Sequence, residues 1–174
     1  MEEKNYIFSI TVYDRPGVLN RISMIFSRRM INIHTINADY IEFKSGEMTR
    51  IVVTFKTNHK MAQTLLKLIR KLVDVVEVDG FDTSSDLIFQ RELALIRLKL
   101  SGNDVDKVLN TVRNFKLTPH ILDLSVEGSL MTVEVAGLPE EIEGLIDELG
   151  PDVVFQAVRS GIAAIPKLRE IDKD

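Results

Sequence analysis

The feature that most constrains the fold is the order in which strand-like and helix-like patterns follow one another. Runs rich in β-branched and aromatic residues are typical of strands, whereas apolar residues recurring every three or four positions indicate helices. In the first half these patterns predict β-α-β-β-α-β, over residues 6–12, 18–30, 31–43, 50–56, 61–72 and 73–79. This order forms an antiparallel four-stranded sheet with two helices on one face, the ferredoxin-like arrangement.

The second half repeats this order with little sequence identity. The patterns predict strands and helices over residues 93–100, 105–115, 121–126, 130–136, 139–149 and 153–159, and the first of these helices is expected to be capped by Asn103 or Asp104. Tight turns are expected at Lys44–Glu47 and Glu127–Ser129. The chain is therefore expected to be α+β, with two ferredoxin-like βαββαβ domains. We expect a domain over residues 1–80, a polar linker over 81–90, a second domain over 91–165 and a charged tail over 166–174.

Composition and charge exclude several classes of protein. The chain of 174 residues has no Cys, so it forms no disulfide, thiolate metal site or Cys nucleophile. A net charge of −4 argues against a dedicated nucleic-acid binder. No apolar run approaches the ~20 residues that span a bilayer, and the polar start MEEKNYIF does not resemble a signal peptide. The expected location is the cytoplasm, with no contact to membranes.

Motifs for catalysis are missing from the sequence. It contains no phosphate-binding or dinucleotide-binding glycine pattern, no G-x-S-x-G elbow and no H-E-x-x-H. His34, His59 and His120 lack the spacing of metal ligands, and the acidic residues between Glu140 and Glu148 have the spacing of a solvated helix face. We therefore expect no catalytic residue and no metal ligand.

RNA-recognition modules share this strand order and provide an alternative function. Their third strand carries paired stacking aromatics, whereas the corresponding segment here is MTRIVVTF. The basic residues Lys67, Arg70 and Lys71 have the spacing of a solvated helix face. The sequence therefore does not favour nucleic acid as a partner.

The junction between the first strand and the first helix is the best candidate for a ligand site. Asp14 is expected to cap the helix, with Pro16 in its first turn. Free amides at a helix N-terminus suit a carboxylate, and Gly17 would let a ligand approach the backbone. Val18 and Leu19 would supply an apolar wall, and Asn32 an amide. Together these groups describe a pocket for a small aliphatic amino acid, although the same residues also suit a plain helix start.

These residues resemble those of the ACT domain, a small-molecule-sensing module of amino-acid metabolism. The pattern is D-R-P-G-V-L at Asp14–Leu19, followed by Asn32-Ile33 at the start of the next strand. Over residues 5–165 the chain resembles the regulatory small subunits of acetolactate synthase. That resemblance rests on the motifs Leu19-x-Arg21, Phe26-Ser27-x-Arg29-x-x-Asn32-Ile33, Thr49-Arg50, Lys71-Leu72-Val73-Asp74-Val75, Arg91-Glu92-Leu93 and Arg159-Ser160-Gly161.

The resemblance implies a non-catalytic subunit that forms a homodimer through its ACT domains. Such subunits bind branched-chain amino acids, chiefly valine, between two ACT domains, and carried over to this chain the effector-binding residues are Asp14, Gly17, Val18, Leu19, Asn32 and Ile33. They activate a catalytic large subunit and confer feedback inhibition on it. Thiamine diphosphate, FAD and Mg²⁺ are expected on that partner and no cofactor on this chain. The second domain is expected to help contact the catalytic subunit. The alternative is a stand-alone ACT-type sensor that regulates another enzyme or a transcription factor.

Two positions depart from the family pattern, which has Asn in place of Asp14 and Gly in place of Met30. The Asp14 carboxylate would accept from a ligand ammonium but repel a nearby carboxylate. Met30 predicts a different end of the first helix, without the usual left-handed residue.

Overall fold

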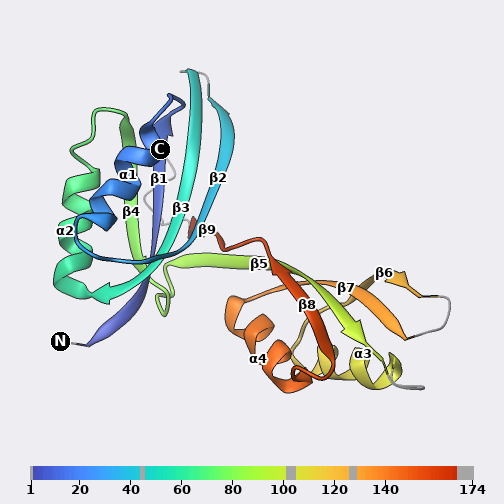
Figure 1. Cartoon of the computed structure of the whole chain (residues 1–174). Helices are drawn as coiled ribbons and strands as arrows, with labels where there is room; N and C mark the ends of the chain where they lie inside the picture. The colour runs from blue at the N-terminus through green and yellow to red at the C-terminus, as the bar shows by residue number, and fades with distance from the viewer. Residues whose placement is uncertain (1, 44–45, 101–104, 126–128, 168–174) are drawn as a thin grey trace. The chain divides into compact units, whose positions relative to one another are not determined.

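A computed structural model describes residues 2–43, 46–100, 105–125 and 129–167, and the chain divides into two compact units. The first unit comprises residues 1–89 together with 163–174, and the second comprises residues 90–162. Each unit has the order β-α-β-β-α-β, so the expected α+β fold with two ferredoxin-like domains is confirmed (Figure 1).

The first unit is a four-stranded antiparallel sheet with both helices on one face (Figure 1). Its strand order is β2-β3-β1-β4, which leaves β2 and β4 at the edges. Its elements are β1 (Glu3–Tyr13), α1 (Val18–Ser27), β2 (Ile33–Phe43), β3 (Gly46–Asn58), α2 (His59–Ile69) and β4 (Val75–Asp82).

Alternation along the central strand β1 separates the two faces of this sheet. Tyr6, Phe8 and Ile10 belong to the core under the helices. The side chains of Ser9 and Thr11, at the alternate positions, face the other side of the sheet. In the core the ring of Phe55 lies 4.8 Å from that of Phe8 and 4.9 Å from that of Phe26, both nearly edge-on. Edge-to-face aromatic packing of this kind adds to the stabilisation from burial.

The second unit repeats this architecture with strand order β6-β7-β5-β8 and a core of its own. In this core the inward-facing residues of β5 and β7 pack against α3 and α4. The elements are β5 (Ile88–Lys99), α3 (Val105–Asn114), β6 (His120–Leu124), β7 (Leu130–Gly137), α4 (Pro139–Leu149) and β8 (Val154–Arg159).

Half of the segment expected to be a linker, residues 81–90, is strand. β4 continues to Asp82 and β5 already begins at Ile88, so only five residues lie between the two strands. They turn because the Asp82 carboxylate accepts hydrogen bonds from the Ser84 amide at 3.0 Å and the Ser84 hydroxyl at 2.9 Å. The polar composition therefore marks a tight turn rather than a spacer.

A ninth strand, β9 (Ala163–Pro166), was not expected. It belongs to the first unit and pairs with β5, and next to it the Lys167 amide donates to the carbonyl of Leu87 at 2.9 Å. The expected boundary at 165 therefore falls inside a strand. Residues 168–174, most of the expected tail, lie outside the described ranges, as do the expected cap at Asn103 or Asp104 and most of the two expected tight turns. Within those ranges, none of the helices is long and apolar enough to cross a bilayer.

The end of α1 is left-handed at Met30, contrary to the sequence-based expectation. Met30 has φ +55°, its amide donates to Ser27, and the Ile31 amide donates back to Phe26. These two hydrogen bonds form a Schellman motif, in which the left-handed residue is normally glycine. Ile31 packs against the core cluster that contains Phe26, so tertiary packing and the two hydrogen bonds offset the cost of the methionine side chain.

Replacing Met30 with glycine is expected to stabilise the first unit by about 1 kcal/mol, because a side chain in the left-handed region costs about that much. The Met30 side chain is 94% exposed, so its removal loses little packing. Urea unfolding measures the change. Ser27→Gly, at the end of the same helix, is the control and is expected to lose about half a kcal/mol. A destabilised Met30→Gly variant would contradict the explanation.

Candidate functional site

The start of α1 is set by a tight turn rather than by an aspartate cap. The Val18 amide donates to the Arg15 carbonyl at 3.3 Å, and Gly17 has φ +84° and ψ −1°. Pro16 followed by a glycine with these angles is typical of a type II turn. Gly17 is the N-cap residue and no side chain caps the helix, so the prediction that Asp14 caps it and that Pro16 lies in its first turn is wrong.

Asp14 instead ends the strand ladder, since its amide donates to the Glu47 carbonyl at 3.1 Å. Its side chain is exposed, as is Gly17. A Cβ built on Gly17 would meet only Arg21, at 3.5 Å, so the space above this glycine is open. The backbone of the turn is therefore accessible to a small molecule.

The first turn of α1 has the features of an anion-binding site. Val18 uses its amide in the turn, but Leu19 and Asn20 are the next two residues and have no intrahelical acceptor. The first turn holds no acidic residue, so the positive end of the helix dipole is not compensated there. Leu19 is 43% exposed and offers an apolar surface beside these amides, whereas Val18 is buried in the core.

Asp74 holds this turn in place, and sequence reasoning did not find that role. Its side chain is buried and accepts from Arg21 at 2.5 Å and from Arg15 at 3.4 Å. The backbone carbonyl of the same residue accepts from the Tyr13 amide at 2.9 Å. Arg15 also lies over the ring of Tyr13. Asp74 thus holds the end of β1 through its backbone carbonyl, and Arg15 and Arg21 on either side of Gly17 through its buried carboxylate.

Asn32 and Ile33 lie at the other end of α1. Asn32 is exposed just before β2, and Ile33 packs partly against the core. A ten-residue helix is about 15 Å long, so one chain does not bring Asn32 next to Gly17. The six sequence-predicted residues therefore form two groups, Asp14–Leu19 at the start of α1 and Asn32-Ile33 after its end.

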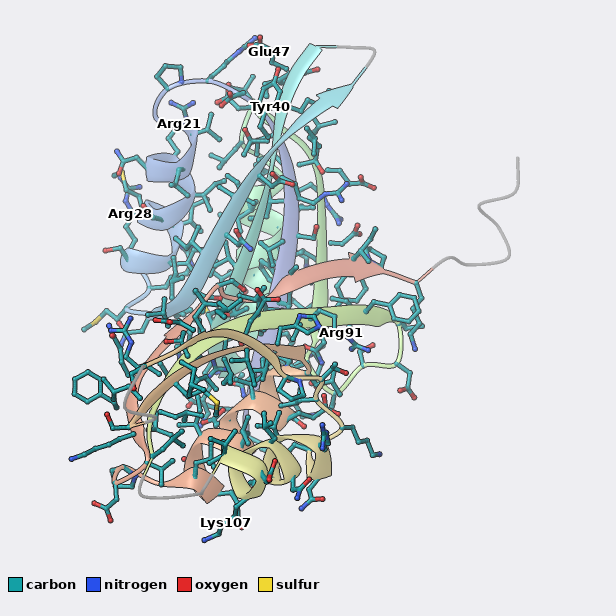
Figure 2. The ribbon with its side chains drawn as sticks, turned by 90° about the vertical axis from the view of Figure 1, so that its right-hand side faces the viewer. Arg21, Arg28, Tyr40, Glu47, Arg91 and Lys107 are labelled. Atoms are coloured by element: carbon teal, nitrogen blue, oxygen red, sulfur yellow. The ribbon has the colours of Figure 1, made fainter. Side chains whose placement is uncertain are left out.

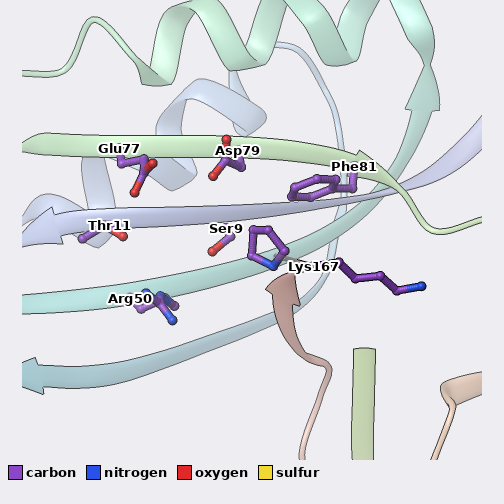
Figure 3. A pocket seen from close by; sticks show the side chains of 8 residues that line it. Ser9, Thr11, Arg50, Glu77, Asp79, Phe81 and Lys167 are labelled. Carbon is purple, nitrogen blue, oxygen red and sulfur yellow. The ribbon is translucent and has the colours of Figure 1, made fainter. Parts of the chain in front are cut away.

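A polar cavity on the other face of the sheet was also missed by sequence reasoning. It has a volume of about 340 Å³ and is distinct from the α1 site (Figure 3). Thr11 pairs with Arg50 on one side and with Glu77 on the other, so these side chains form a polar row across three strands. The alternation of polar residues along β1 was the available signal. The residues lining the cavity are Ser9, Thr11, Arg50, Glu77, Asp79, Phe81, Pro166 and Lys167.

Two titrating groups with perturbed pKa lie away from the α1 turn, near the N-terminal end of β1. The amide of Ser84 and the ammonium of Lys4, 3.0 Å away, hold the pKa of Asp82 below its usual range. The same carboxylate raises the pKa of Lys4. No group of three or more metal-ligating side chains occurs within the residues that the structure describes.

Comparison with known proteins first identifies the class of each unit. Residues 8–77 match the family model described as the AHAS small subunit-like ACT domain, and residues 91–168 match the model described as the small subunit of acetolactate synthase. The first unit, with its glycine turn at the start of α1, is an ACT domain.

Similarity to individual proteins extends over nearly the whole chain. The acetolactate synthase small subunit of Bacillus subtilis is 30% identical over 161 residues, covering 92% of this chain and 90% of the relative. That of Mycobacterium leprae is 30% identical over 162 residues, covering 93% and 91%. The crystal structure of the Thermotoga maritima small subunit superposes with a TM-score of 0.79 at 27% identity, covering 95% and 99%. The chain belongs to the acetolactate synthase small-subunit family.

Proposed function

We propose that this chain is the regulatory, non-catalytic subunit of a cytoplasmic acetolactate synthase in branched-chain amino-acid biosynthesis. It would activate a thiamine-diphosphate-dependent catalytic subunit and make it sensitive to valine. Thiamine diphosphate, FAD and Mg²⁺ would be held by that partner. Similarity to small subunits over both units supports this function more than a stand-alone ACT sensor, because the second unit has its own match to the small-subunit family.

The observation that carries the sensing proposal is the open turn at Gly17 in front of two free amides. The amides of Leu19 and Asn20 would bind the carboxylate of valine, and the exposed Leu19 side chain would contact its isopropyl group. Asp14 is exposed just before this turn and would accept from the ammonium group. These groups complete only part of a site, because Asn32 lies at the far end of α1.

A second copy of the chain would complete the site. β2 is an edge strand of 11 residues, and unpaired edges of this length are templates for another strand. Ile41 of β2 and Tyr13 of β1 both pair with Met48, so β2 ends level with the start of α1. Antiparallel pairing of two β2 edges would therefore place Asn32 and Ile33 of one copy beside Gly17 of the other.

Regulation would then follow from linkage. Valine would bind one arrangement of the dimer better than another. A difference of about 1–3 kcal/mol would change the affinity for the partner, or the population of one arrangement, several-fold to about a hundredfold. The arrangement disfavoured by valine would be the one that activates the catalytic subunit.

Titration calorimetry of valine, leucine and isoleucine into the purified chain tests the sensing function, and co-purification tests the partner. We expect valine to bind at one site per chain and a thiamine-diphosphate enzyme to co-purify. A chain that binds none of the three amino acids, alone or assembled, would refute the sensing function. Capture of a different enzyme or a transcription factor would favour the stand-alone sensor.

Replacing Asn32 with alanine is expected to weaken valine binding about fivefold, because one hydrogen bond is worth about 1 kcal/mol. Calorimetry measures the loss. The matched control is Asn110→Ala, at an exposed position of α3 in the second unit. It should bind valine with the affinity of the unmodified chain. Unchanged affinity in Asn32→Ala would remove Asn32 from the site.

A further inference from the structure

The basic residues of the first unit are concentrated in two segments that contain no acidic residue. Residues 15–38 and 48–73 hold ten of the chain's 22 lysines and arginines and no Asp or Glu, although the chain as a whole has a charge of −4. These segments contain α1 and α2. Both helices lie on the same face of the sheet and contribute basic but no acidic residues to it, whereas Arg50 of β3 lies at the cavity on the other face.

A groove runs between these two helices. Its volume is about 540 Å³, and Figure 2 shows Arg21 and Arg28 along one side of α1. Its floor is apolar and its rim carries guanidinium groups. We call it the helical groove and define it by Arg21, Met24, Ile25, Arg28, Arg29, Leu68 and Leu72.

The positive charge around the helical groove is only partly neutralised. Arg21 is paired with Asp74, and Arg29 donates to the Ile25 carbonyl. Within the described part of the chain, Arg28, Lys67 and Lys71 form no ion pair. All three side chains are exposed; Lys67 lies on α2 next to the lining residue Leu68, and Lys71 follows the end of α2 next to the lining residue Leu72. An occupant with carboxylates would find unpaired cations at the end of α1 and along and just after α2.

We propose that the helical groove binds an acidic, amphipathic segment of the catalytic chain, an inference that rests on the proposed function. Arginine and methionine are enriched in protein interfaces and acidic residues are depleted from their cores, as here. Met24 is 41% exposed and offers apolar surface for such a segment. The groove has no aromatic side chain on which a nucleic-acid base would stack, so its chemistry favours a protein segment over a nucleic acid.

The position of the helical groove couples it to the effector turn. At 100° per residue, Arg21, Ile25 and Arg28 lie on one flank of α1, and Leu19 and Ser23 on the opposite flank. One rigid helix would therefore contact the partner on one side and the amino acid on the other. A small shift of α1 on valine binding would move the groove directly, so no further residues would be needed to couple the effector turn to the groove.

The test reverses two unpaired charges in the full-length chain, one at the C-cap of α1 and one just after α2. The variant Arg28→Glu/Lys71→Glu is compared with Lys99→Glu/Lys107→Glu, which makes the same change in net charge at two exposed positions of the second unit. Affinity for the catalytic chain is measured by binding to the immobilised catalytic chain at low and high salt. Valine binding is measured by calorimetry. A fluorescent DNA duplex and a fluorescent RNA serve as further probes.

We expect the groove variant to bind the catalytic chain about 100-fold more weakly, with a smaller dependence on salt, and to bind valine like the unmodified chain. The control variant should keep its affinity for the catalytic chain. Equal affinity of the groove variant and the unmodified chain, or an equal loss in the control, would overturn the proposal. Binding of the duplex or the RNA at physiological salt that the groove variant abolishes would assign the groove to nucleic acid instead. If the unmodified chain binds valine but no catalytic chain, the regulatory-subunit function fails along with this inference.

Discussion

The Gly17→Asp variant is expected to lose valine binding by at least about 100-fold, which corresponds to about 2.7 kcal/mol. The new carboxylate would lie at the turn in front of the Leu19 and Asn20 amides and would accept the hydrogen bonds proposed for the effector. It would also repel the carboxylate of valine. Calorimetry on the variant measures the loss, and valine inhibition of the assembled enzyme should disappear with it.

The matched control for this variant is Gly17→Asn, which has nearly the same shape without the charge. Both residues tolerate the left-handed conformation that φ +84° requires, and a Cβ at this position meets only Arg21 at 3.5 Å. The fold should therefore survive in both, with a cost near 1 kcal/mol. We expect Gly17→Asn to lose less affinity than Gly17→Asp. Unchanged valine sensitivity in Gly17→Asp would overturn the site assignment.

The Phe55→Ala variant is expected to destabilise the first unit by about 3–5 kcal/mol and to leave the second unit unchanged. Phe55 is fully buried, and its ring makes edge-on contacts with both Phe8 and Phe26, so truncation leaves a cavity that this rigid cluster fills poorly. Such a loss is a large part of the stability of a domain of this size.

Tyrosine fluorescence measures this effect in the first unit alone. The chain has no Trp, and its three tyrosines, Tyr6, Tyr13 and Tyr40, all lie in that unit. Circular dichroism measures the unfolding of both units together. The reciprocal variant Ile142→Ala, in the second core, should shift the circular-dichroism transition while the tyrosine transition stays in place. Equal shifts of both transitions in either variant would show that the two cores unfold as one.

The order of elements was predictable because it depends on local periodicity. The apolar repeat of α1 and the alternation of β1 were enough to place the helix and the strand and to assign the fold class. The sequence placed the start of α1 near Pro16 and Gly17, but the Val18 amide donates to the Arg15 carbonyl and closes a type II turn before the helix, so Asp14 and Pro16 lie outside it. Boundaries were less accurate where polar residues continue a strand, as at the end of β4 and the start of β5.

Only part of the candidate site could be predicted from the sequence. Gly17 and Leu19 were identified from a motif in which the relevant residues are consecutive. The anchor of that motif, Asp74, is 53 residues away from Arg21, and no local pattern marks their pairing. Whether Asn32 contributes to the same site depends on a second copy of the chain, and that dependence became visible only when Asn32 appeared at the opposite end of α1.

The sequence by itself determined the order of helices and strands in each βαββαβ unit and the presence of a glycine at the start of α1, because these follow from the conformational preferences of neighbouring residues. The tertiary structure alone decided that Met30 is left-handed, that β9 returns to the first unit, that β2 is an open edge and that Arg21, Arg28 and Arg29 line a groove between α1 and α2. Each of these depends on contacts between residues far apart in the chain, where packing and hydrogen bonds worth a few kcal/mol override local preferences of about 1 kcal/mol.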